Sequence, residues 1–144
     1  MSVLFIIHGP NLNLLGSREP EIYGNLTLDE INIKLIQAGE ELDIEAQTYQ
    51  SNSEGGLIDL LHQAGEKADG VIINPGGYTH TSVALRDAVS AIDIPVIEVH
   101  LSNVYAREEF RHRSLLSPVC IGKITGFGWH SYLLALHAFA YQKE

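Results

Sequence analysis

The stretch 71-VIINPGGYTHTSVALRDAVSAI-92 holds one complete strand–turn–helix unit, and it decides the fold class. It begins with a continuous apolar run, Val71 to Ile73, which is typical of a parallel strand covered on both faces. A Pro-Gly-Gly turn follows, and the apolar residues after the turn then repeat with the spacing of a helix. These are Leu85, Ala88, Val89 and Ile92. The stretch therefore predicts a strand, a ligand-accessible turn and a helix that packs back on the sheet.

The same alternation covers the rest of the chain. Further strands are predicted at Val3 to Ile7, Ile44 to Tyr49, Val96 to Val99 and Val119 to Ile124. Further helices are predicted after a capping box at Thr27 to Glu30, at Leu57 to Ala64, and in a last segment with Trp129, Leu133, Leu136 and Ala140 on one face. We therefore expect one α/β domain over residues 1–144. Its expected form is a flavodoxin-like three-layer sandwich around a five-stranded parallel sheet of order 2-1-3-4-5.

Composition narrows the function classes. Hydrophobic residues make up 45% of the chain and charged residues 19%, as in a soluble globular protein. The net charge of −9 argues against nonspecific binding of nucleic acid, although a few local arginines can still attract an anionic ligand. The single cysteine, Cys120, lies in an apolar run and is predicted to be a core residue. With no signal-peptide core and no stretch of membrane-spanning length, a cytoplasmic location is expected.

A ligand site is expected at the carboxyl ends of the first, third and fourth strands, where the strand order reverses. The segments that follow these strands are rich in polar side chains, whereas the strands are not. They are residues 8–24 with Asn11, Asn13, Arg18 and Tyr23; residues 74–82 with Asn74 and His80; and residues 100–113 with His100, Ser102, Arg107, Arg111 and Arg113. The Pro-Gly-Gly turn and the helix start after it favour an anion.

Two side chains of this site suggest acid–base chemistry. Glu98 and His100 are two residues apart on a strand, so they leave the same face. Their pairing can hold His100 as a general acid, or it can simply satisfy two polar groups at a strand end. Tyr23 can be a packing residue or a base. A free tyrosine has a pKa near 10, so the phenolate costs about 4 kcal/mol at pH 7. A cation such as Arg18 can offset that cost.

Other chemistries find less support. A metal site built from His80, His100 and Glu98 is conceivable, but the nearby arginines would repel a cation. The chain contains no GxxxxGK[ST], GxGxxG or GxSxG motif. An acid and a base on opposite sides of a small anion suit elimination of water from a hydroxyl β to a carbonyl. A non-catalytic or flavin-binding module of the same fold is the main alternative, and a metal-dependent hydrolase is a third.

Five blocks of the sequence together resemble the type II 3-dehydroquinases. They are GPNLNLLGSREPEIYG (9–24), YQSNSEGGLID (49–59), INPGGYTHTSVALRDA (73–88), PVIEVHLSNVYAREEFRHRS (95–114) and GFGWHSYLLAL (126–136). The resemblance implies a cofactor-independent lyase that converts 3-dehydroquinate to 3-dehydroshikimate by anti elimination through an enolate. It also implies a step of the shikimate pathway or of quinate catabolism, and a homododecamer built as a tetramer of trimers.

The resemblance also implies a role for each site residue. Tyr23 would be the base, Arg18 its cation on a lid of about residues 17–24, and His100, oriented by Glu98, the acid. Asn11 would hold a water at the enolate. The substrate carboxylate would meet Asn74, Ser102 and the amides of Leu101 and Ser102. His80 and Arg111 would bind ring hydroxyls, and Asp87 would reach the site of a neighbouring subunit. One departure is Ser131, where the family pattern has glycine, and we interpret it as a packing adjustment.

Overall fold

The computed structural model describes residues 1–17 and 19–142, and its core is a five-stranded sheet. Every neighbouring pair of strands is parallel, and the order is β2-β1-β3-β4-β5, as predicted. The strands are β1 (Ser2–His8), β2 (Ile44–Gln50), β3 (Gly70–Asn74), β4 (Val96–His100) and β5 (Gly122–Thr125). Because β1, β3 and β4 are central, their carboxyl ends lie next to one another, and the chain reverses its direction of winding there.

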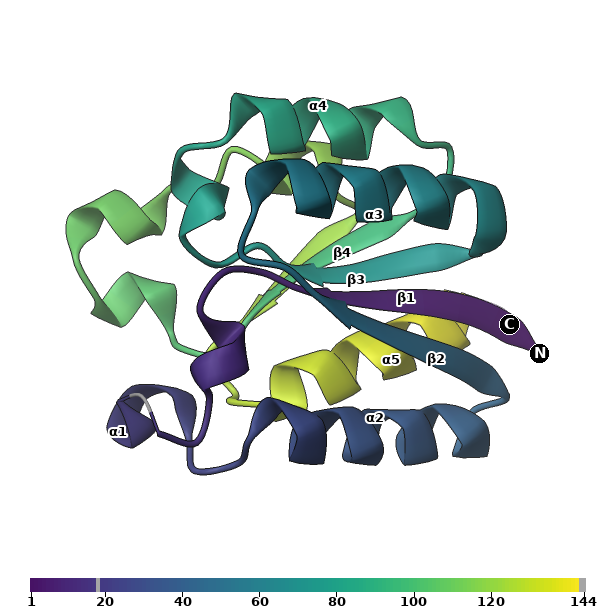
Figure 1. Cartoon of the computed structure of the whole chain (residues 1–144), viewed down its shortest axis with the longest axis horizontal. Helices are drawn as coiled ribbons and strands as arrows, with labels where there is room; N and C mark the ends of the chain where they lie inside the picture. The colour runs from purple at the N-terminus through teal and green to yellow at the C-terminus, as the bar shows by residue number, and fades with distance from the viewer. Residues whose placement is uncertain (18, 143–144) are drawn as a thin grey trace.

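Helices cover both faces of this sheet, giving the three layers predicted (Figure 1). On one face lie α2 (Leu28–Glu41) and α5 (His130–Gln142), and on the other α3 (Glu54–Lys67) and α4 (Val83–Ala91). Alternate residues of β1 serve the two layers: Leu4 and Ile6 pack with α2 and α5, whereas Phe5 and Ile7 pack with α3 and α4. This two-sided burial explains why the central strands are continuous apolar runs. Among the described residues, no helix has the length and apolar character that a membrane span requires.

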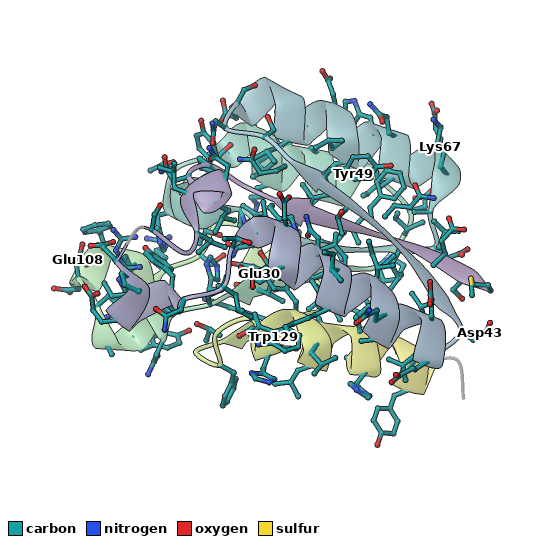
Figure 2. The ribbon with its side chains drawn as sticks, turned by 60° about the horizontal axis from the view of Figure 1, so that its bottom comes forward. Glu30, Asp43, Tyr49, Lys67, Glu108 and Trp129 are labelled. Atoms are coloured by element: carbon teal, nitrogen blue, oxygen red, sulfur yellow. The ribbon has the colours of Figure 1, made fainter. Side chains whose placement is uncertain are left out.

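The predicted capping box begins α2. Thr27 Oγ1 accepts a hydrogen bond from the Glu30 amide at 3.2 Å, and Glu30 Oε1 accepts one from the Thr27 amide at 3.3 Å. Two of the first helical N–H groups are thus satisfied by side chains. Figure 2 shows Glu30 at this end of α2, which the short helix α1 (Pro20–Tyr23) precedes in the chain.

The last predicted strand begins later than expected. Val119 ends a 3₁₀ turn, Ser117–Val119, and Cys120 follows that turn, so β5 starts only at Gly122. Pro118 explains the difference, because its ring fixes φ and removes an amide donor near the start of the turn. Cys120 still packs against the core, half-buried beside the α3–α4 layer. Its predicted position in a strand is therefore wrong, whereas its predicted contact with the core is found.

The buried face of α5 also differs from the prediction. Tyr132, Ala135, Leu136 and Phe139 face the sheet, whereas Trp129 precedes the helix, and Leu133 and Ala140 are only partly buried. Leu133 and Leu134 make the helix apolar around much of its circumference, so spacing alone does not identify the inner face. Ser131 is fully buried, and its Oγ accepts a hydrogen bond from the Phe127 amide at 3.2 Å, which agrees with a packing role.

Candidate active site

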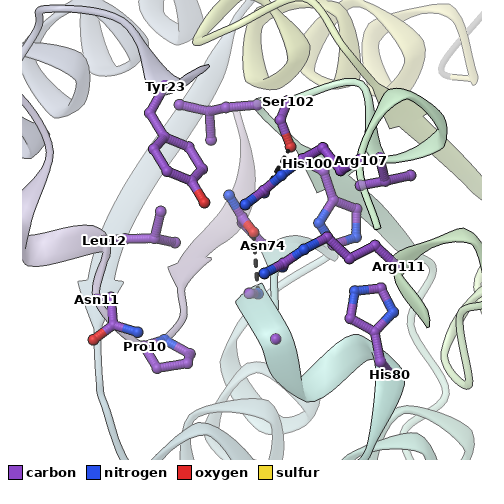
Figure 3. Close-up of a pocket in the computed structure, with 14 residues that line it drawn as sticks. Pro10, Asn11, Leu12, Tyr23, Asn74, His80, His100, Ser102, Arg107 and Arg111 are labelled. Carbon is purple, nitrogen blue, oxygen red and sulfur yellow. Dashed lines mark hydrogen bonds between the residues drawn. The ribbon is translucent and has the colours of Figure 1, made fainter. Parts of the chain in front are cut away.

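A pocket opens where β1, β3 and β4 end, as the strand order predicts (Figure 3). It brings together most of the predicted site residues: Asn11, Tyr23, Asn74, His80, His100, Leu101, Ser102 and Arg111. Two of the described residues stand apart from this group: Glu98 lies behind His100, and Asp87 is exposed on α4 outside the pocket of its own chain. The predicted Arg18 lies outside the described residues.

The wall after β1 depends on a close approach to β3. The Gly9 amide donates to the Asn74 carbonyl at 2.7 Å, and a Cβ at residue 9 would meet that same oxygen at 2.7 Å. Only glycine fits at such a contact. Asn11 follows with φ of 70°, a left-handed conformation that asparagine tolerates, and its amide donates to Asn52 Oδ1 at 2.9 Å. The turn thus carries Asn11 to the rim of the pocket.

Asn13, for which the sequence suggested no role, lies in this amide cluster and not in the pocket. Gln50 Nε2 approaches Asn13 Oδ1 at 3.5 Å and donates to Asn52 Oδ1 at 3.1 Å. These contacts join the loop after β1 to the loop after β2. Asn13 therefore lies at the junction of these two loops.

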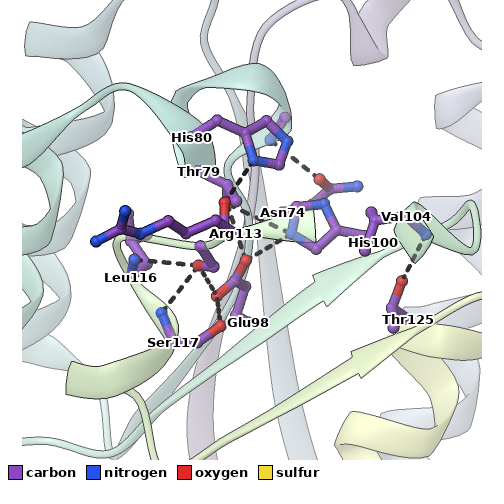
Figure 4. A network of polar contacts seen from close by, with 12 residues as sticks. Asn74, Thr79, His80, Glu98, His100, Val104, Arg113, Leu116, Ser117 and Thr125 are labelled. Atoms are coloured by element: carbon purple, nitrogen blue, oxygen red, sulfur yellow. Dashed lines mark hydrogen bonds and ion pairs between the residues drawn. The ribbon is translucent and has the colours of Figure 1, made fainter. Parts of the chain in front are cut away.

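Glu98 and His100 form a buried pair on the same face of β4, as their spacing predicts (Figure 4). His100 Nε2 lies 2.6 Å from Glu98 Oε2. Because a carboxylate only accepts, Nε2 carries a proton, and Nδ1 is the ring nitrogen available to the pocket. The Thr79 hydroxyl donates to the same carboxylate oxygen at 2.9 Å.

The other oxygen of Glu98 is held by two serines. Ser114 and Ser117 donate to Oε1 at 2.8 and 2.7 Å. Burial alone raises the pKa of Glu98, but the hydrogen bond and charge of His100, followed by these hydroxyls, outweigh it and lower the pKa to about 2. Glu98 is therefore a fixed negative charge behind His100. The sequence did not single out Ser114 and Ser117, which follow β4 by more than a dozen residues.

His80 has a defined tautomer. Its Nδ1 lies 2.8 Å from the Arg113 carbonyl, which only accepts, so Nδ1 carries the proton and Nε2 is an acceptor. Burial lowers the pKa of His80, and the charges of His100, Arg111 and Lys123 lower it further, against the opposing effect of the Arg113 carbonyl. His80 is thus a neutral hydrogen-bond acceptor at pH 7, suited to a hydroxyl group.

Two arginines bring positive charge to the pocket. The Arg107 guanidinium lies 5.4 Å from the centroid of the Tyr23 ring and donates to Ser102 Oγ at 3.3 Å. The Arg111 Nε lies 3.1 and 3.2 Å from the two carboxylate oxygens of Glu108, which aligns its side chain along the pocket. Arg107 was predicted only as one of three cations after β4, and its place over Tyr23 requires the folded chain. The pocket suits a small anion.

The turn after β4 completes the anion site. The Leu101 carbonyl accepts the Gly128 amide at 2.9 Å, and the Ser102 carbonyl accepts the Thr125 hydroxyl at 2.7 Å. With both carbonyls held on the far side, this turn presents the buried Ser102 side chain to the pocket beside Asn74.

Other candidate groups do not form reactive sites. Within residues 1–17 and 19–142, no three His, Cys, Asp or Glu side chains are grouped to hold a metal ion. Burial raises the pKa of Cys120 to about 12, with a further contribution from the charge of Glu98, so the thiol stays protonated. This agrees with a packing role for Cys120.

Comparison with known proteins places this geometry in a family. A family model described as dehydroquinase class II matches residues 1–140. A 3-dehydroquinate dehydratase from Pelotomaculum thermopropionicum is 61% identical over 137 residues, which cover 95% of each chain. A crystal structure of a type II dehydroquinase from Butyrivibrio crossotus superposes with a TM-score of 0.93 at 45% identity, covering 95% of this chain and 96% of that one. Another from Propionibacterium acnes gives 0.95 at 41% identity, covering 98% and 97%.

The match to the family model extends over nearly the whole chain, the relatives match it in length, and the solved structures share its fold. The chain belongs to the class II dehydroquinase family.

Proposed function

We propose that this protein converts 3-dehydroquinate to 3-dehydroshikimate and water by anti elimination through an enolate. The observation that carries the proposal is the placement of Tyr23 and His100 on different walls of one arginine-lined pocket (Figure 3), with the buried Glu98 behind His100. A base and an acid so placed can act on opposite faces of one small ring. The substrate is inferred from the names of the relatives, and the acid–base groups of the pocket suit that substrate.

Binding uses the polar wall between the two groups. The substrate carboxylate is placed at Asn74, Ser102 and the turn amides of residues 101 and 102, next to the Arg107 guanidinium. The hydroxyls of the ring are placed at His80 Nε2 and at Arg111. These contacts hold the substrate ring with one face toward Tyr23 and the other toward His100. Binding energy is thereby used to orient the reacting atoms toward the base and the acid.

The first chemical step breaks a carbon–hydrogen bond. The Tyr23 phenolate takes the proton from the carbon α to the ketone, and the electron pair of that bond moves toward the ketone oxygen as an enolate. Arg18 keeps its predicted role as the cation beside Tyr23, although it lies outside the described residues, and Arg107 adds a second guanidinium 5.4 Å from the centroid of the Tyr23 ring. A water held by Asn11 stabilises the enolate oxygen, because donors aimed at developing charge lower the barrier.

The second step expels water. The enolate electrons re-form the ketone and a new carbon–carbon double bond, and the β carbon–oxygen bond breaks. The departing hydroxyl takes a proton from His100 Nδ1, while Glu98 stabilises the imidazolium that precedes this transfer. The proton gained by Tyr23 and the proton lost by His100 balance after exchange with solvent.

An ultraviolet assay tests the proposal. The product contains a conjugated enone, so 3-dehydroquinate should give new ultraviolet absorbance that a chelator does not abolish. Tyr23→Phe should remove nearly all turnover while leaving substrate binding nearly intact, because only the acid–base hydroxyl is lost. Tyr141→Phe, at an exposed tyrosine of α5, is the matched control and should retain activity. No absorbance change with micromolar enzyme would refute the function, and visible flavin absorbance of the pure protein would favour the binding module.

The homododecamer, with Asp87 completing the site of a neighbouring subunit, is also part of the proposal. Asp87 is exposed on α4, and Val83 of the same helix and Phe110 are exposed apolar residues. Twelve chains of 15.9 kDa would give a particle of about 190 kDa, which light scattering measures directly. A monomer of full activity would refute the shared site. The cytoplasmic location stays a prediction.

A further inference from the structure

A buried hydrogen-bond chain runs from the pocket into the core below it. Asn74 lines the pocket, and its Nδ2 lies 3.2 Å from the Tyr132 hydroxyl. That hydroxyl lies 2.7 Å from His8 Nδ1, and His8 Nε2 lies 2.8 Å from Asn32 Oδ1. Tyr132 and His8 are fully buried and Asn74 is nearly so, yet none of the proposed chemical steps uses Tyr132 or His8.

The partners at the pocket end set the direction of every hydrogen bond. The Gly76 amide can only donate, and it lies 3.1 Å from the Asn74 side chain, so Oδ1 faces Gly76. The amide nitrogen of Asn74 therefore faces Tyr132 and donates to its oxygen. With its oxygen accepting from Asn74, the Tyr132 hydroxyl needs an acceptor of its own, and His8 Nδ1 is the partner within reach.

The ionisation of both inner groups fits this direction. Burial raises the pKa of Tyr132, so its hydroxyl keeps the proton that it donates. Burial lowers the pKa of His8 to about 4, against a smaller opposing effect of Asn32, so the ring is neutral at pH 7. A neutral ring with a proton on Nε2 has the lone pair on Nδ1 that Tyr132 requires.

We propose that Tyr132, held by His8, is a positioning residue that keeps an N–H of Asn74, and not its carbonyl, directed at the carboxylate of the substrate. One Nδ2 hydrogen of Asn74 is used by Tyr132, and the other is directed to the pocket. A reversed amide would present its oxygen to the substrate carboxylate and its nitrogen to the Gly76 amide, and both contacts would be repulsive. The inference rests on the proposed function for the nature of the anion.

Tyrosine suits this task because its ring spans the layer under Asn74 while its hydroxyl both donates and accepts. The ring packs edge-on against His8, with centroids 5.0 Å apart at 68°, so Tyr132→Phe keeps the packing and removes only the oxygen. The same change leaves Asn74 Nδ2 and His8 Nδ1 without this partner. One hydrogen bond to a charged group corresponds to about a tenfold effect on binding.

A double-mutant cycle tests the proposal. Tyr132→Phe should lower kcat/KM about tenfold, mainly by raising KM. In an Asn74→Ala background the same change should alter kcat/KM less than twofold, because Tyr132 acts through Asn74. Circular dichroism and the thermal midpoint establish that each variant is folded at the assay temperature. An equal loss in both backgrounds, or no loss in a folded Tyr132→Phe protein, overturns the proposal.

Replacing His8 tests the inner end of the chain. His8→Asn can place a carbonyl oxygen near the position of Nδ1, whereas His8→Leu offers the Tyr132 hydroxyl no acceptor. KM should therefore rise more in His8→Leu than in His8→Asn when both are folded. An equal KM in the two variants contradicts the role assigned to the His8 acceptor.

Nitrogen NMR of labelled histidine gives a readout that does not depend on catalysis. The signal that disappears in His8→Asn should report a neutral ring at pH 6 with its proton on Nε2. A proton on Nδ1, or a charged ring at that pH, overturns the proposal. A wild-type protein without dehydratase activity would refute the proposed function instead, and this NMR result would still decide the direction of the chain.

Discussion

Nε2 of His100 lies 2.6 Å from Oε2 of Glu98, and both side chains are buried beneath the pocket. The carboxylate has further donors in Thr79, Ser114 and Ser117, so its ionised form is satisfied on both oxygens. A charge held in this way can balance a positive charge on His100 during general acid catalysis. It also gives His100 one orientation, with Nδ1 toward the substrate.

Neutralising Glu98 should therefore make His100 a less effective general acid. We expect Glu98→Gln to lower kcat about a hundredfold, a typical contribution of one general acid or base, because the imidazolium loses its counter-charge. Steady-state kinetics at pH 7 checks this. Ser117→Ala, which removes one donor and keeps the charge, should cost much less. A Glu98→Gln kcat within twofold of wild type would refute the role of the carboxylate.

The acid stability of the protein should report the buried His8. Its pKa is about 4 in the folded chain and 6.5 in the reference state, so the unfolded chain binds the proton first as pH falls. The stabilisation is complete above pH 6.5 and is lost between pH 6.5 and about 4. At about 1.4 kcal/mol for each pH unit, the free energy of unfolding should fall by about 2 kcal/mol between pH 7 and pH 5.

Urea unfolding at both pH values and one fixed protein concentration measures that fall. His8→Asn should remove most of it, since asparagine does not titrate. Glu98 contributes only at lower pH, because its stabilising effect is lost as pH drops below 4.5 toward its folded pKa of about 2. The same pH dependence in the wild type and in His8→Asn would show that His8 is not its source.

These two predictions differ in how far the sequence anticipates them. Glu98 and His100 could be paired from their spacing, because alternate residues of a strand share a face. The pocket could be placed because the carboxyl ends of parallel strands meet at one edge. His8 and Tyr132 are 124 residues apart and meet only when α5 packs under β1, so no local pattern predicts their contact. Ser114 and Ser117 reach Glu98 from an irregular loop, which has no periodicity to interpret.

The same reasoning explains where the fold predicted from the sequence differs from the structure. Continuous apolar runs identify buried central strands, and a capping box identifies a helix start, because each pattern satisfies local backbone or burial requirements. An apolar run interrupted by a proline turn, as before β5, combines two structures in one pattern. The uniformly apolar α5 leaves its inner face to tertiary packing. Arg107 likewise required the fold, since three arginines follow β4 and only distances separate their roles.

Arg107 should be needed for turnover. Its guanidinium lies 5.4 Å from the Tyr23 ring centroid and donates to Ser102 Oγ at 3.3 Å, so one charge faces both the proposed base and the proposed carboxylate site. Arg107→Met should lower kcat/KM at pH 7 by about tenfold or more, because one hydrogen bond to a charged group is worth about that factor. Arg107→Lys keeps the charge and should retain more of kcat/KM than Arg107→Met. Equal losses in the two variants would show that the charge of Arg107 is not what turnover requires.

The Cys120 thiol should react only slowly with alkylating reagents in the folded protein. Burial holds the pKa of its thiol near 12, so almost no thiolate exists at pH 8. Iodoacetamide at pH 8 should label the native protein slowly and the urea-unfolded protein rapidly, as mass spectrometry can follow. Cys120→Ala should keep kcat, since the thiol touches no reacting group. Rapid labelling of the native protein with loss of activity would place Cys120 in the site after all.

The shared active site can be tested by mixing two inactive proteins. Asp87 is exposed on α4 and lies outside the pocket of its own chain, so we expect Asp87→Asn to damage the neighbouring site and leave its own Tyr23 intact. Tyr23→Phe subunits carry the reverse defect. In randomly mixed oligomers, a site is complete when a subunit with Tyr23 adjoins a subunit with Asp87, which gives about a quarter of wild-type turnover.

Co-expression of the two variants with different affinity tags, followed by tandem purification, supplies these mixed oligomers. Each variant expressed alone is the control for residual activity. Recovery of turnover in the mixture, and not in a blend of separately assembled proteins, locates Asp87 across a subunit boundary. If the co-expressed mixture is as inactive as its components, Asp87 does not act in trans. Its exposure on α4 would then reflect an ordinary solvated carboxylate.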